Sequence, residues 1–400
     1  PGYEVACMTA GKVLQLSPGM SGWDIYELAS TGIYPSLMGE QPTIEIGNVY
    51  SGNSGNEIVL QGGSINHYGL IQMIHNDPIS GWNAATVRDF DGFIGGTWCA
   101  RVGDFDSRYA GDEIFYIYEG VYDFSVGYSL RPVFTGNPLW WTYQEELIYD
   151  AEVGMDAGIG DFDPSHPGNE IVVVTEMGPA YEVSGMQVGK IWSWTQTEIF
   201  NMTIVDAGWT VEVADVNNAD GIEEIVFGTR YNNKIVLSEY DPVTGLHNPQ
   251  VLFIGNATSN PKNMWDVAVG NVIGSNNKLE IVGVDDTGSV YLVDYNGVSW
   301  QGRTIWQDTD GLYAVVVGDF VPGWGSDEIL VAGESGKITM LSIAFDGDLT
   351  GEGDVNYDDL DEFAQAWLTD DSSADFMPQP YGDGIVNFLE LAVLADNWLE

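Results

Sequence analysis

The sequence is poor in positive charge. Its 400 residues include 12 Lys and Arg and four His, against 60 Asp and Glu, which gives a formal net charge of −48. Such a surface repels nucleic acid and anionic membranes, and it keeps the protein soluble through self-repulsion. We therefore expect no nucleic-acid partner, and a chain suited to binding cations or to a salty medium.

Cysteine and long apolar segments are scarce as well. The two cysteines, Cys7 and Cys99, fall at different positions of the repeat described below, so we expect separate buried thiols. No apolar run approaches the roughly 18 residues that a membrane-spanning helix needs, so we expect no membrane insertion. Residue 1 is Pro rather than Met. We therefore expect a processed chain whose signal peptide has been removed, located outside the cell or on its surface.

Catalytic motifs are missing too. None of the four His residues has the partner spacing of a metal site, and the sequence contains no nucleophile elbow, zinc helix or phosphate loop. The chain is nevertheless 44% hydrophobic with 14 Trp, which excludes a disordered polypeptide. These features predict a folded protein that is not an enzyme.

What the sequence does contain is a repeat. Six nearly complete copies span 44–63, 100–120, 157–178, 211–230, 267–288 and 315–336, and a seventh, at 3–17, has only the second half. A glutamate opens that half in every copy: Glu4, Glu57, Glu113, Glu170, Glu224, Glu280 and Glu328. Successive glutamates are 48 to 57 residues apart. A period near 50 residues with several short strands is typical of a β-propeller.

Residues 265–310 illustrate one unit. WDVAVGNV, LEIVGVD, SVYLVDY and SWQGRTIWQ read as four strands, with turn signals at 286–288 and 296–297. Runs such as EIVVV, apolar on both faces, indicate strands buried between neighbouring blades. The sequence therefore predicts a mainly β fold, with four antiparallel strands in each blade.

The ends of the repeat region are incomplete. The first unit lacks its inner strand and the last unit lacks its fourth strand, so we count 26 of the 28 strands of a seven-bladed propeller over residues 1–345. Six blades with a rearranged seam are the alternative. Pairing of the two termini, or a strand donated by another molecule, could fill the gaps.

Two repeats carry a recognisable signature. GDFDSRYAGDEIF (103–115) and GDFDPSHPGNEIVV (160–173) resemble FG-GAP/VCBS-type propeller repeats. In that family, the loop after the inner strand often binds calcium through acidic residues. The resemblance implies calcium ligands at Asp104, Asp106 and Asp112, at Asp161 and Asp163, and at Asp215, Asn217 and Asp220. Alternatively, these side chains cap the backbone of their own loops.

The region after residue 345 has a different pattern. DLTGEGDVNYDD (348–359) places Asp348, Thr350, Glu352, Asp354, Asn356 and Asp359 at ligand positions of an EF-hand-type loop, with Gly353 at its sharp turn. An amphipathic helix should follow, with Leu360, Phe363, Ala364 and Trp367 on one face. A second loop recurs 31 residues later. Its ligands would be Asp375, Asp383, Ile385, Asn387 and Glu390.

Two such loop-and-helix units look like a dockerin domain at 346–400, of a kind similar to that in secreted planctomycete-type proteins. The resemblance implies bound calcium and a cohesin-like scaffold as partner. The partner-marking loop positions hold Tyr357-Asp358 and Phe388-Leu389 rather than small hydroxyl residues. No linker separates this tail from the propeller, which would hold it rigidly and allow contacts with other copies of the chain.

A series of aromatic residues precedes the inner strands. Trp98, Trp209, Trp265 and Tyr313, with Met155 in the same series, should ring one mouth of the central channel. They could stack on sugar faces or pack the channel closed.

Three functions remain open. The first is a secreted non-catalytic propeller for adhesion, carbohydrate binding or attachment to an extracellular scaffold through its calcium-loaded tail. The second is a self-assembling extracellular filament, tube or surface layer. The third is a polysaccharide lyase, for which His67 with Tyr68, or Arg101, would be the candidates. Twelve Lys and Arg and a charge of −48 suit a polyuronate substrate poorly.

Overall fold

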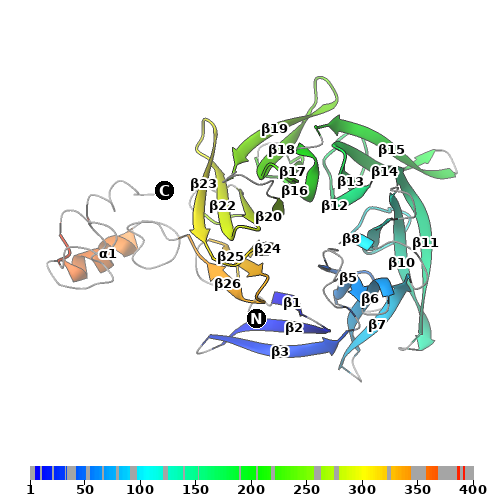
Figure 1. The fold of residues 1–400 in the computed structure, drawn as a ribbon, viewed down its shortest axis with the longest axis horizontal. Coiled ribbons are helices and arrows are strands. Elements are labelled where there is room, and N and C mark those ends of the chain that lie inside the picture. Colours follow the sequence, from blue (N-terminus) through cyan, green and yellow to red (C-terminus); the bar gives the residue numbers. More distant parts are fainter. Residues whose placement is uncertain are drawn as a thin grey trace.

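In the computed structural model, seven antiparallel sheets stand around a common axis (Figure 1). The structure describes residues 5–9, 11–19, 22–31, 33, 42–50, 55–64, 67–77, 81–90, 97–119, 125–137, 140–151, 153–188, 191–203, 206–217, 221–255, 263–273, 279–321, 326–343, 357–367, 385–387 and 391. The fold is therefore the predicted seven-bladed propeller, and the six-bladed alternative is wrong.

The strands follow the chain blade by blade. The first three blades consist of β1 (Val5–Thr9), β2 (Lys12–Gly19) and β3 (Gly22–Ser30); β4 (Thr43–Gly47), β5 (Glu57–Ser64), β6 (His67–Asp77) and β7 (Gly81–Asp89); and β8 (Thr97–Gly103), β9 (Glu113–Glu119), β10 (Ser125–Asn137) and β11 (Trp140–Ala151). The fourth blade consists of β12 (Gly154–Gly160), β13 (Glu170–Thr175), β14 (Pro179–Val188) and β15 (Ile191–Asn201).

The remaining blades repeat this order. They consist of β16 (Gly208–Ala214), β17 (Glu224–Thr229), β18 (Lys234–Asp241) and β19 (Leu246–Ile254); β20 (Met264–Gly270), β21 (Glu280–Asp285), β22 (Ser289–Tyr295) and β23 (Trp300–Gln307); and β24 (Leu312–Gly318), β25 (Glu328–Gly333) and β26 (Ile338–Leu341). Among the described residues, the first blade has no inner strand and the seventh no outer strand. Both gaps were predicted.

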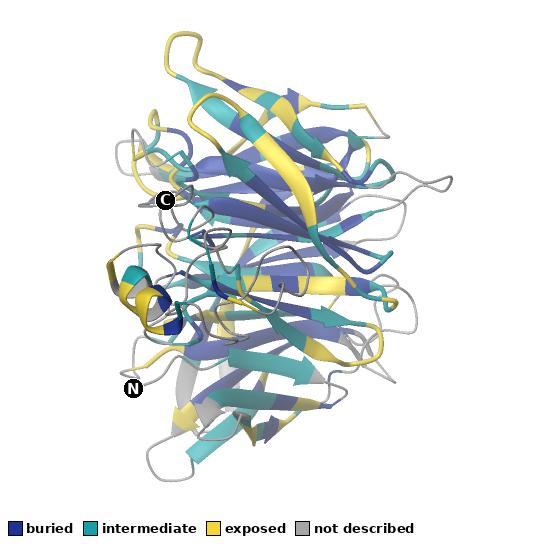
Figure 2. Cartoon of the chain, turned by 90° about the vertical axis from the view of Figure 1, so that its left-hand side faces the viewer, coloured by how far each residue is buried: buried dark blue, intermediate teal, exposed yellow. Residues whose placement is uncertain are grey.

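Apolar cores lie between the blades. Six clusters of buried side chains each join two consecutive blades, from the first and second to the sixth and seventh. The second strands are therefore covered on both sides, and every residue of β13, β17 and β21 is buried. Outer strands such as β23 are largely exposed (Figure 2). The continuous apolar runs of the sequence have this origin.

Glycine ends most inner strands because the next blade packs directly against it. A Cβ atom on Gly47 would lie 2.3 Å from Val102 of the third blade, and one on Gly270 would lie 2.2 Å from Val317 of the seventh. At Gly160 the Cβ would meet both Val213 and Glu223 of the fifth blade. The repeated Gly therefore marks the closest approach of consecutive blades.

The tail contributes one described helix, α1 (Tyr357–Ala366), which Figure 1 shows outside the ring. Phe363 and Ala366 pack with Val386, and Leu360, Trp367 and Leu391 border this small core. The helix occurs where it was predicted, but its buried face includes Ala366, whereas Ala364 is exposed. The second predicted helix lies outside the described residues, apart from Leu391.

Two further expectations can be compared with the structure. Cys7 and Cys99 are separate free thiols, as predicted, and Cys99 is buried, whereas Cys7 is only half-buried. In the part of the chain that is described, no helix has the length and apolar character needed to cross a membrane.

Candidate functional site

The glutamate that recurs in the repeat has a structural role. In the second to seventh blades, the glutamate that opens the second strand accepts a hydrogen bond from a backbone N–H of the preceding loop, at 2.7–3.2 Å. The pairs are Glu57–Tyr50, Glu113–Asp106, Glu170–Asp163, Glu224–Val216, Glu280–Ile273 and Glu328–Phe320. Burial raises the pKa of Glu113 to about 8, of Glu170 to about 9 and of Glu224 to about 7. Through these hydrogen bonds, Glu113, Glu170 and Glu224 hold the loops that were predicted to bind calcium.

In the third blade, the three predicted ligands make separate contacts. Asp106 is buried, accepts the backbone N–H of Arg108 at 3.1 Å and forms an ion pair with the Arg108 guanidinium at 2.5 Å. The Asp112 carboxylate accepts the backbone N–H of Asn48 in the second blade, and Asp104 is exposed. Because Arg108 already neutralises Asp106, these contacts favour the capping alternative in this loop.

The fourth blade differs. Asp163 accepts the backbone N–H of Ser165 at 2.9 Å, and His166 Nδ1 lies 3.1 Å from both Asp163 and Glu182. One ligand atom of each of these three residues lies within 4.8 Å of the others. Burial alone would raise the pKa of Asp163, but hydrogen bonds from Ser165 and His166 lower it overall. Burial and the neighbouring Asp163 raise the pKa of Glu182.

This cluster suits a metal ion that binds nitrogen as well as oxygen ligands. Calcium prefers oxygen ligands, whereas imidazole suits zinc and similar metals. Glu182 lies on β14, outside the loop that carries Asp163 and His166. The spacing of residues within that loop could therefore not have shown that Glu182 belongs to the cluster. Asp161, the other predicted ligand, is exposed, and its backbone is bonded to Glu223 instead.

In the fifth blade, the Asn217 amide donates to the Glu224 carboxylate at 2.5 Å, and Asp215 is half-buried. Asp220 lies outside the described residues. The Asn217 side chain thus bonds the glutamate that opens the second strand. Of the tail ligands, Asp348, Thr350, Glu352, Asp354, Asn356, Asp375, Asp383 and Glu390 also lie outside the described residues. Asp359 lies in α1, and the Asn387 amide donates to the carbonyl oxygen of Ile385 at 2.8 Å.

Reciprocal backbone and carboxylate contacts join alternate pairs of blades at this end of the ring. Asn48 with Asp112, Asp161 with Glu223, and Asn271 with Asp327 each exchange two hydrogen bonds. The counterpart between the third and fourth blades would be Asp104 with Asn169. Both residues are exposed, and no such exchange occurs between them.

A cavity of about 300 Å³ opens at this unjoined position. It is lined by Asp104, Phe105, Ser107, Tyr109, Pro167, Gly168, Asn169, Glu170, Ser184, Gly185 and Trp192. The Trp192 indole N–H is buried without a hydrogen-bond partner, and the Arg108 guanidinium lies 5.0 Å from its ring centroid. The Arg131 guanidinium lies 3.7 Å from the Tyr109 ring centroid. Aromatic side chains with a few polar groups are typical of small-molecule sites.

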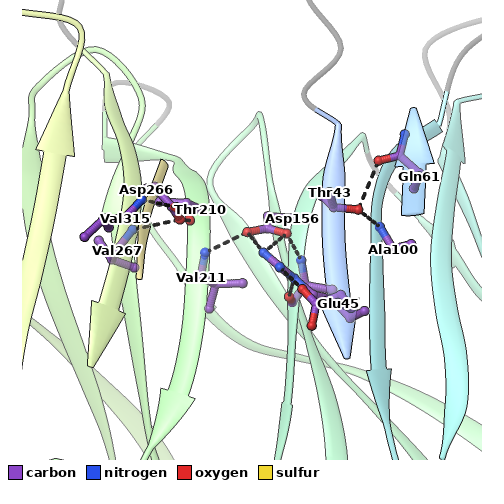
Figure 3. A network of polar contacts seen from close by, with 12 residues as sticks. Thr43, Glu45, Gln61, Ala100, Asp156, Thr210, Val211, Asp266, Val267 and Val315 are labelled. Atoms are coloured by element: carbon purple, nitrogen blue, oxygen red, sulfur yellow. Dashed lines mark hydrogen bonds and ion pairs between the residues drawn. The ribbon is translucent and has the colours of Figure 1, made fainter. Parts of the chain in front are cut away.

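A network of charged groups crosses the inner strands (Figure 3). The Arg101 guanidinium in β8 pairs with Glu45 of β4 at 2.5 Å and with Asp156 of β12 at 2.7 Å, and its Nε donates to the carbonyl oxygen of Ala157. Burial raises the pKa of Glu45 despite Arg101. Arg101 therefore holds together the second, third and fourth blades.

The network continues around the ring. Asp156 accepts the backbone N–H of Val211, and Asp266 accepts the backbone N–H of Val315 as well as the Thr210 hydroxyl. Burial raises the pKa of Asp266 to about 7, and it raises the pKa of Glu212 to about 8. Glu212 is exposed to solvent in the channel, so water screens part of this effect. Sequence analysis missed Asp156, Glu212 and Asp266, although each lies two or four positions before the last residue of its inner strand.

The aromatic series gathers at the opposite end of the inner strands. The ring centroids of Trp209 and Trp265 are 5.1 Å apart, and those of Trp265 and Tyr313 are 4.9 Å apart, both edge to face. Arg230 lies over Trp209 at 5.1 Å, and Trp98 is half-buried. Edge-to-face contact is the geometry of packed aromatic side chains, so it favours packing over sugar stacking here.

The described cations are all engaged. Eight of the nine Lys and Arg pair with carboxylates: Lys12–Glu27, Arg88–Glu145, Arg101–Glu45, Arg108–Asp106, Arg230–Glu176, Lys234–Asp206, Arg303–Asp294 and Lys337–Asp308. The ninth, Arg131, binds Gln144 and Tyr109. Arg101, a lyase candidate, is therefore part of a structural network. The structure does not describe the side chains of His67 and Tyr68.

Comparison with known proteins finds only distant structural similarity. No protein-family model and no curated protein matches the sequence. Two solved structures of BBS1N in complex with ARL6DN, soaked with mercury and with lead, are 13% identical to it. They cover 85% of this chain, and 92% and 91% of theirs, with TM-scores of 0.45 and 0.44. A structure of the Dos1 propeller is 11% identical, covers 83% of this chain and 72% of its own, and has a TM-score of 0.45.

Proposed function

We propose that this protein is a secreted, non-catalytic propeller that binds neutral carbohydrate in the cavity between its third and fourth blades. The observation that carries the proposal is the composition of that cavity. Asp104, Asn169 and Trp192 border the cavity. Asp104 and Asn169 are exposed, and they do not make the inter-blade hydrogen bonds that the corresponding residues of other blades make. A carboxylate and an amide can bind adjacent sugar hydroxyls, while an aromatic ring contacts the apolar face of the sugar.

Two features make a neutral ligand the better choice. The chain carries a net charge of −48, which repels polyanions. Burial raises the pKa of Glu170, at the cavity wall, to about 9, so this carboxyl is protonated at neutral pH and can donate a hydrogen bond. The volume of about 300 Å³ is at the lower limit for ligand pockets, about 300–1,000 Å³, and suits a short sugar segment.

The absence of a catalytic assembly is also part of the proposal. A lyase needs a cation or metal to neutralise the uronate carboxylate and a base to remove a proton. The nine described Lys and Arg are already bonded within the fold. The appearance of ultraviolet-absorbing unsaturated sugars on incubation with polyuronates would count against this part.

Screening immobilised oligosaccharides tests the binding proposal. We expect neutral glycans to bind and polyuronates not to bind. Asp104→Ala and Asn169→Ala should each weaken binding, because each removes a polar group from the cavity. Asp24→Ala, an exposed change in the first blade, is the matched control. Binding only of anionic glycans, or equal binding by all three variants, would contradict the proposal.

Calcium in the tail is a second part of the proposal, and the dockerin-like resemblance supports it. The small core of Phe363, Ala366 and Val386 joins α1, which follows the first predicted loop, to a residue of the second predicted loop, so calcium should stabilise it. Loss of helical circular dichroism on chelation, restored by calcium, is the expected result. An unchanged spectrum and melting profile would refute calcium loading, and a cohesin-like partner would then lose its support.

Self-assembly is the second candidate function. The seventh blade ends at β26, which has no outer neighbour among the described residues, and Ile338 on this strand is 37% exposed. Contacts between unlike surfaces of successive molecules give open fibres. Electron microscopy with calcium and with chelator tests this: regular polymers support it, whereas single rings under both conditions refute it.

A further inference from the structure

The fourth blade carries a buried carboxylate at a position that is uncharged in every other blade. Glu182 of β14 pairs with Val172 and is 4% exposed. The registers of the other six blades place uncharged residues at the corresponding position: Gln15, Met73, Ser129, Leu237, Leu292 and Met340. A buried carboxylate is costly unless a cation or hydrogen bonds compensate it. Glu182 is therefore an exception that the repeat itself does not explain.

Asp163, the carboxylate beside Glu182, also lacks the cation that its counterpart has. In the third blade, Arg108 forms an ion pair with Asp106. The aligned residues of the fourth blade are Ser165 and Asp163. Among the described residues, no Lys or Arg pairs with either Asp163 or Glu182. The two carboxylates therefore share one small region in which the basic side chain is a histidine.

The geometry around this histidine fits a metal ion. His166 Nδ1 lies 3.1 Å from an oxygen of Asp163 and 3.1 Å from an oxygen of Glu182, and the three atoms all lie within 4.8 Å of one another. A single N–H cannot align well with both oxygens. Metal–ligand bonds of about 2.0–2.1 Å at tetrahedral angles place neighbouring ligand atoms about 3.3 Å apart. The nitrogen and the two oxygens thus have nearly the spacing of ligands to one ion.

Backbone contacts already hold Asp163 in place for such a role. Its Oδ1 accepts the backbone N–H of Ser165 at 2.9 Å, which leaves Oδ2 directed at His166. The backbone N–H of Asp163 donates to Glu170 at 3.2 Å. Hydrogen bonds of this kind orient metal ligands and are a regular part of metal sites. The carboxylate of Asp163 is therefore fixed by the protein on one side and available on the other.

A second histidine beside the cluster has no hydrogen-bond partner. His247 on β19 of the fifth blade is 9% exposed, and neither of its ring nitrogens is hydrogen-bonded within the described part of the chain. Its ring packs edge to face on Phe162, the residue before Asp163, at 5.7 Å. Burial lowers the pKa of His247 to about 4, while the charge of Asp163 acts in the opposite direction. A neutral imidazole with a free acceptor nitrogen therefore lies near the two carboxylates.

We propose that Asp163, His166 and Glu182 bind one divalent transition-metal ion such as zinc, and that a water molecule on this ion donates a hydrogen bond to His247. Metal sites with three protein ligands keep a fourth position for water. The ion compensates the two buried carboxylates, and its water links the fourth blade to the fifth. Calcium fits poorly, because it prefers six to eight oxygen ligands. The site is separate from the proposed sugar cavity and does not depend on it.

Zinc titration of the intact 400-residue chain tests the proposal. The protein is first treated with chelator and then kept in excess calcium, which fills oxygen-only sites such as those predicted in the tail. Isothermal titration should show one zinc ion bound per chain, and zinc should raise the melting temperature by mass action. If excess calcium prevents zinc binding, or if no zinc binds, the proposal is wrong.

Variants locate the ion. Glu182→Gln and His166→Gln should each weaken zinc binding at least about a hundredfold, and His247→Phe about tenfold, as expected for an outer contact. Glu182→Gln removes a buried charge, so folding should be preserved, which melting curves verify. Glu198→Gln, at an exposed carboxylate of the same blade, is the matched control and should bind zinc as the unmodified protein does.

Two results would overturn the assignment. Equal zinc affinity of Glu182→Gln and Glu198→Gln would show that the ion binds elsewhere, and unchanged affinity of His247→Phe would remove the water-mediated contact. Asn169→Ala, which should weaken sugar binding, should bind zinc normally. The zinc site and the sugar site can therefore fail independently of each other.

Discussion

The Asp112 carboxylate of the third blade accepts the backbone N–H of Asn48 in the second blade at 2.7 Å, and the N–H of Asp112 donates to the carbonyl oxygen of Asn48 at 2.9 Å. Two further pairs of blades have the same exchange. Side-chain and backbone hydrogen bonds thus supplement the apolar cores in joining the blades. The candidate binding cavity lies between the third and fourth blades, at one of the interfaces without this exchange.

Asp112→Ala should destabilise the ring by about 1–2 kcal/mol, because it leaves the Asn48 N–H without its charged acceptor. Urea unfolding measures the change. Asp24→Ala, at an exposed position of the first blade, should alter stability by less than about 0.5 kcal/mol. Equal midpoints for the two variants would show that the exchange contributes nothing.

Gly160→Ala should be more harmful than its size suggests. The new Cβ would lie 2.3 Å from Glu223 and 2.4 Å from Val213, so these two side chains would have to shift, at a cost of about 1–3 kcal/mol. At Gly55 the space around a new Cβ is free to 4 Å, and Gly55→Ala is the matched control. Thermal melts of both variants compare them, and a similar loss in each would argue against close blade contact at Gly160.

Arg101→Met should cost about 2–4 kcal/mol, since it leaves Glu45 and Asp156 without their shared cation. The lower figure allows for the 21% exposure of the Arg101 side chain. Arg303→Met breaks an ion pair in which Arg303 is 50% exposed and should cost about 0.5 kcal/mol or less. If denaturation finds the two variants equally stable, the central network is not structural.

Stability should fall as pH rises from about 5 to 9, in part through Glu170. Burial raises its folded-state pKa to about 9, above the unfolded value of about 4.3. The folded state therefore holds the proton more tightly, and this contribution is lost progressively as pH rises through the folded pKa. Glu170→Gln keeps an acceptor for the Asp163 N–H but cannot ionise. Its melting temperature should therefore vary less with pH than that of the unmodified protein, and an identical pH dependence would contradict the assignment.

The blades could be predicted from the sequence because their determinants are local and repeated. A glutamate at the start of each second strand and a Gly at the end of most inner strands recur with the period of the fold. The two incomplete blades could be counted in the same way. Helix α1 could also be placed, although its buried face shifted from Ala364 to Ala366.

The sites could not be predicted to the same extent, because their contacts cross between strands and blades. Asp106 was expected to bind calcium, and its ion pair with the neighbouring Arg108 was not foreseen. The cluster of Asp163, His166 and Glu182 joins a loop to β14. The cavity depends on a contact that Asp104 and Asn169 do not make. No spacing within a single repeat carries this information.

Isothermal titration with a neutral oligosaccharide selected by the screen tests the central claim most directly. The unmodified protein should bind one ligand per chain, and Asn169→Ala should bind at least about tenfold more weakly, the loss expected for one well-placed hydrogen bond. Tyr313→Ala, at the aromatic series on the opposite end of the ring, should bind as the unmodified protein does. If Tyr313→Ala loses affinity and Asn169→Ala keeps it, the sugar binds at the channel mouth and the cavity between the third and fourth blades is not the site.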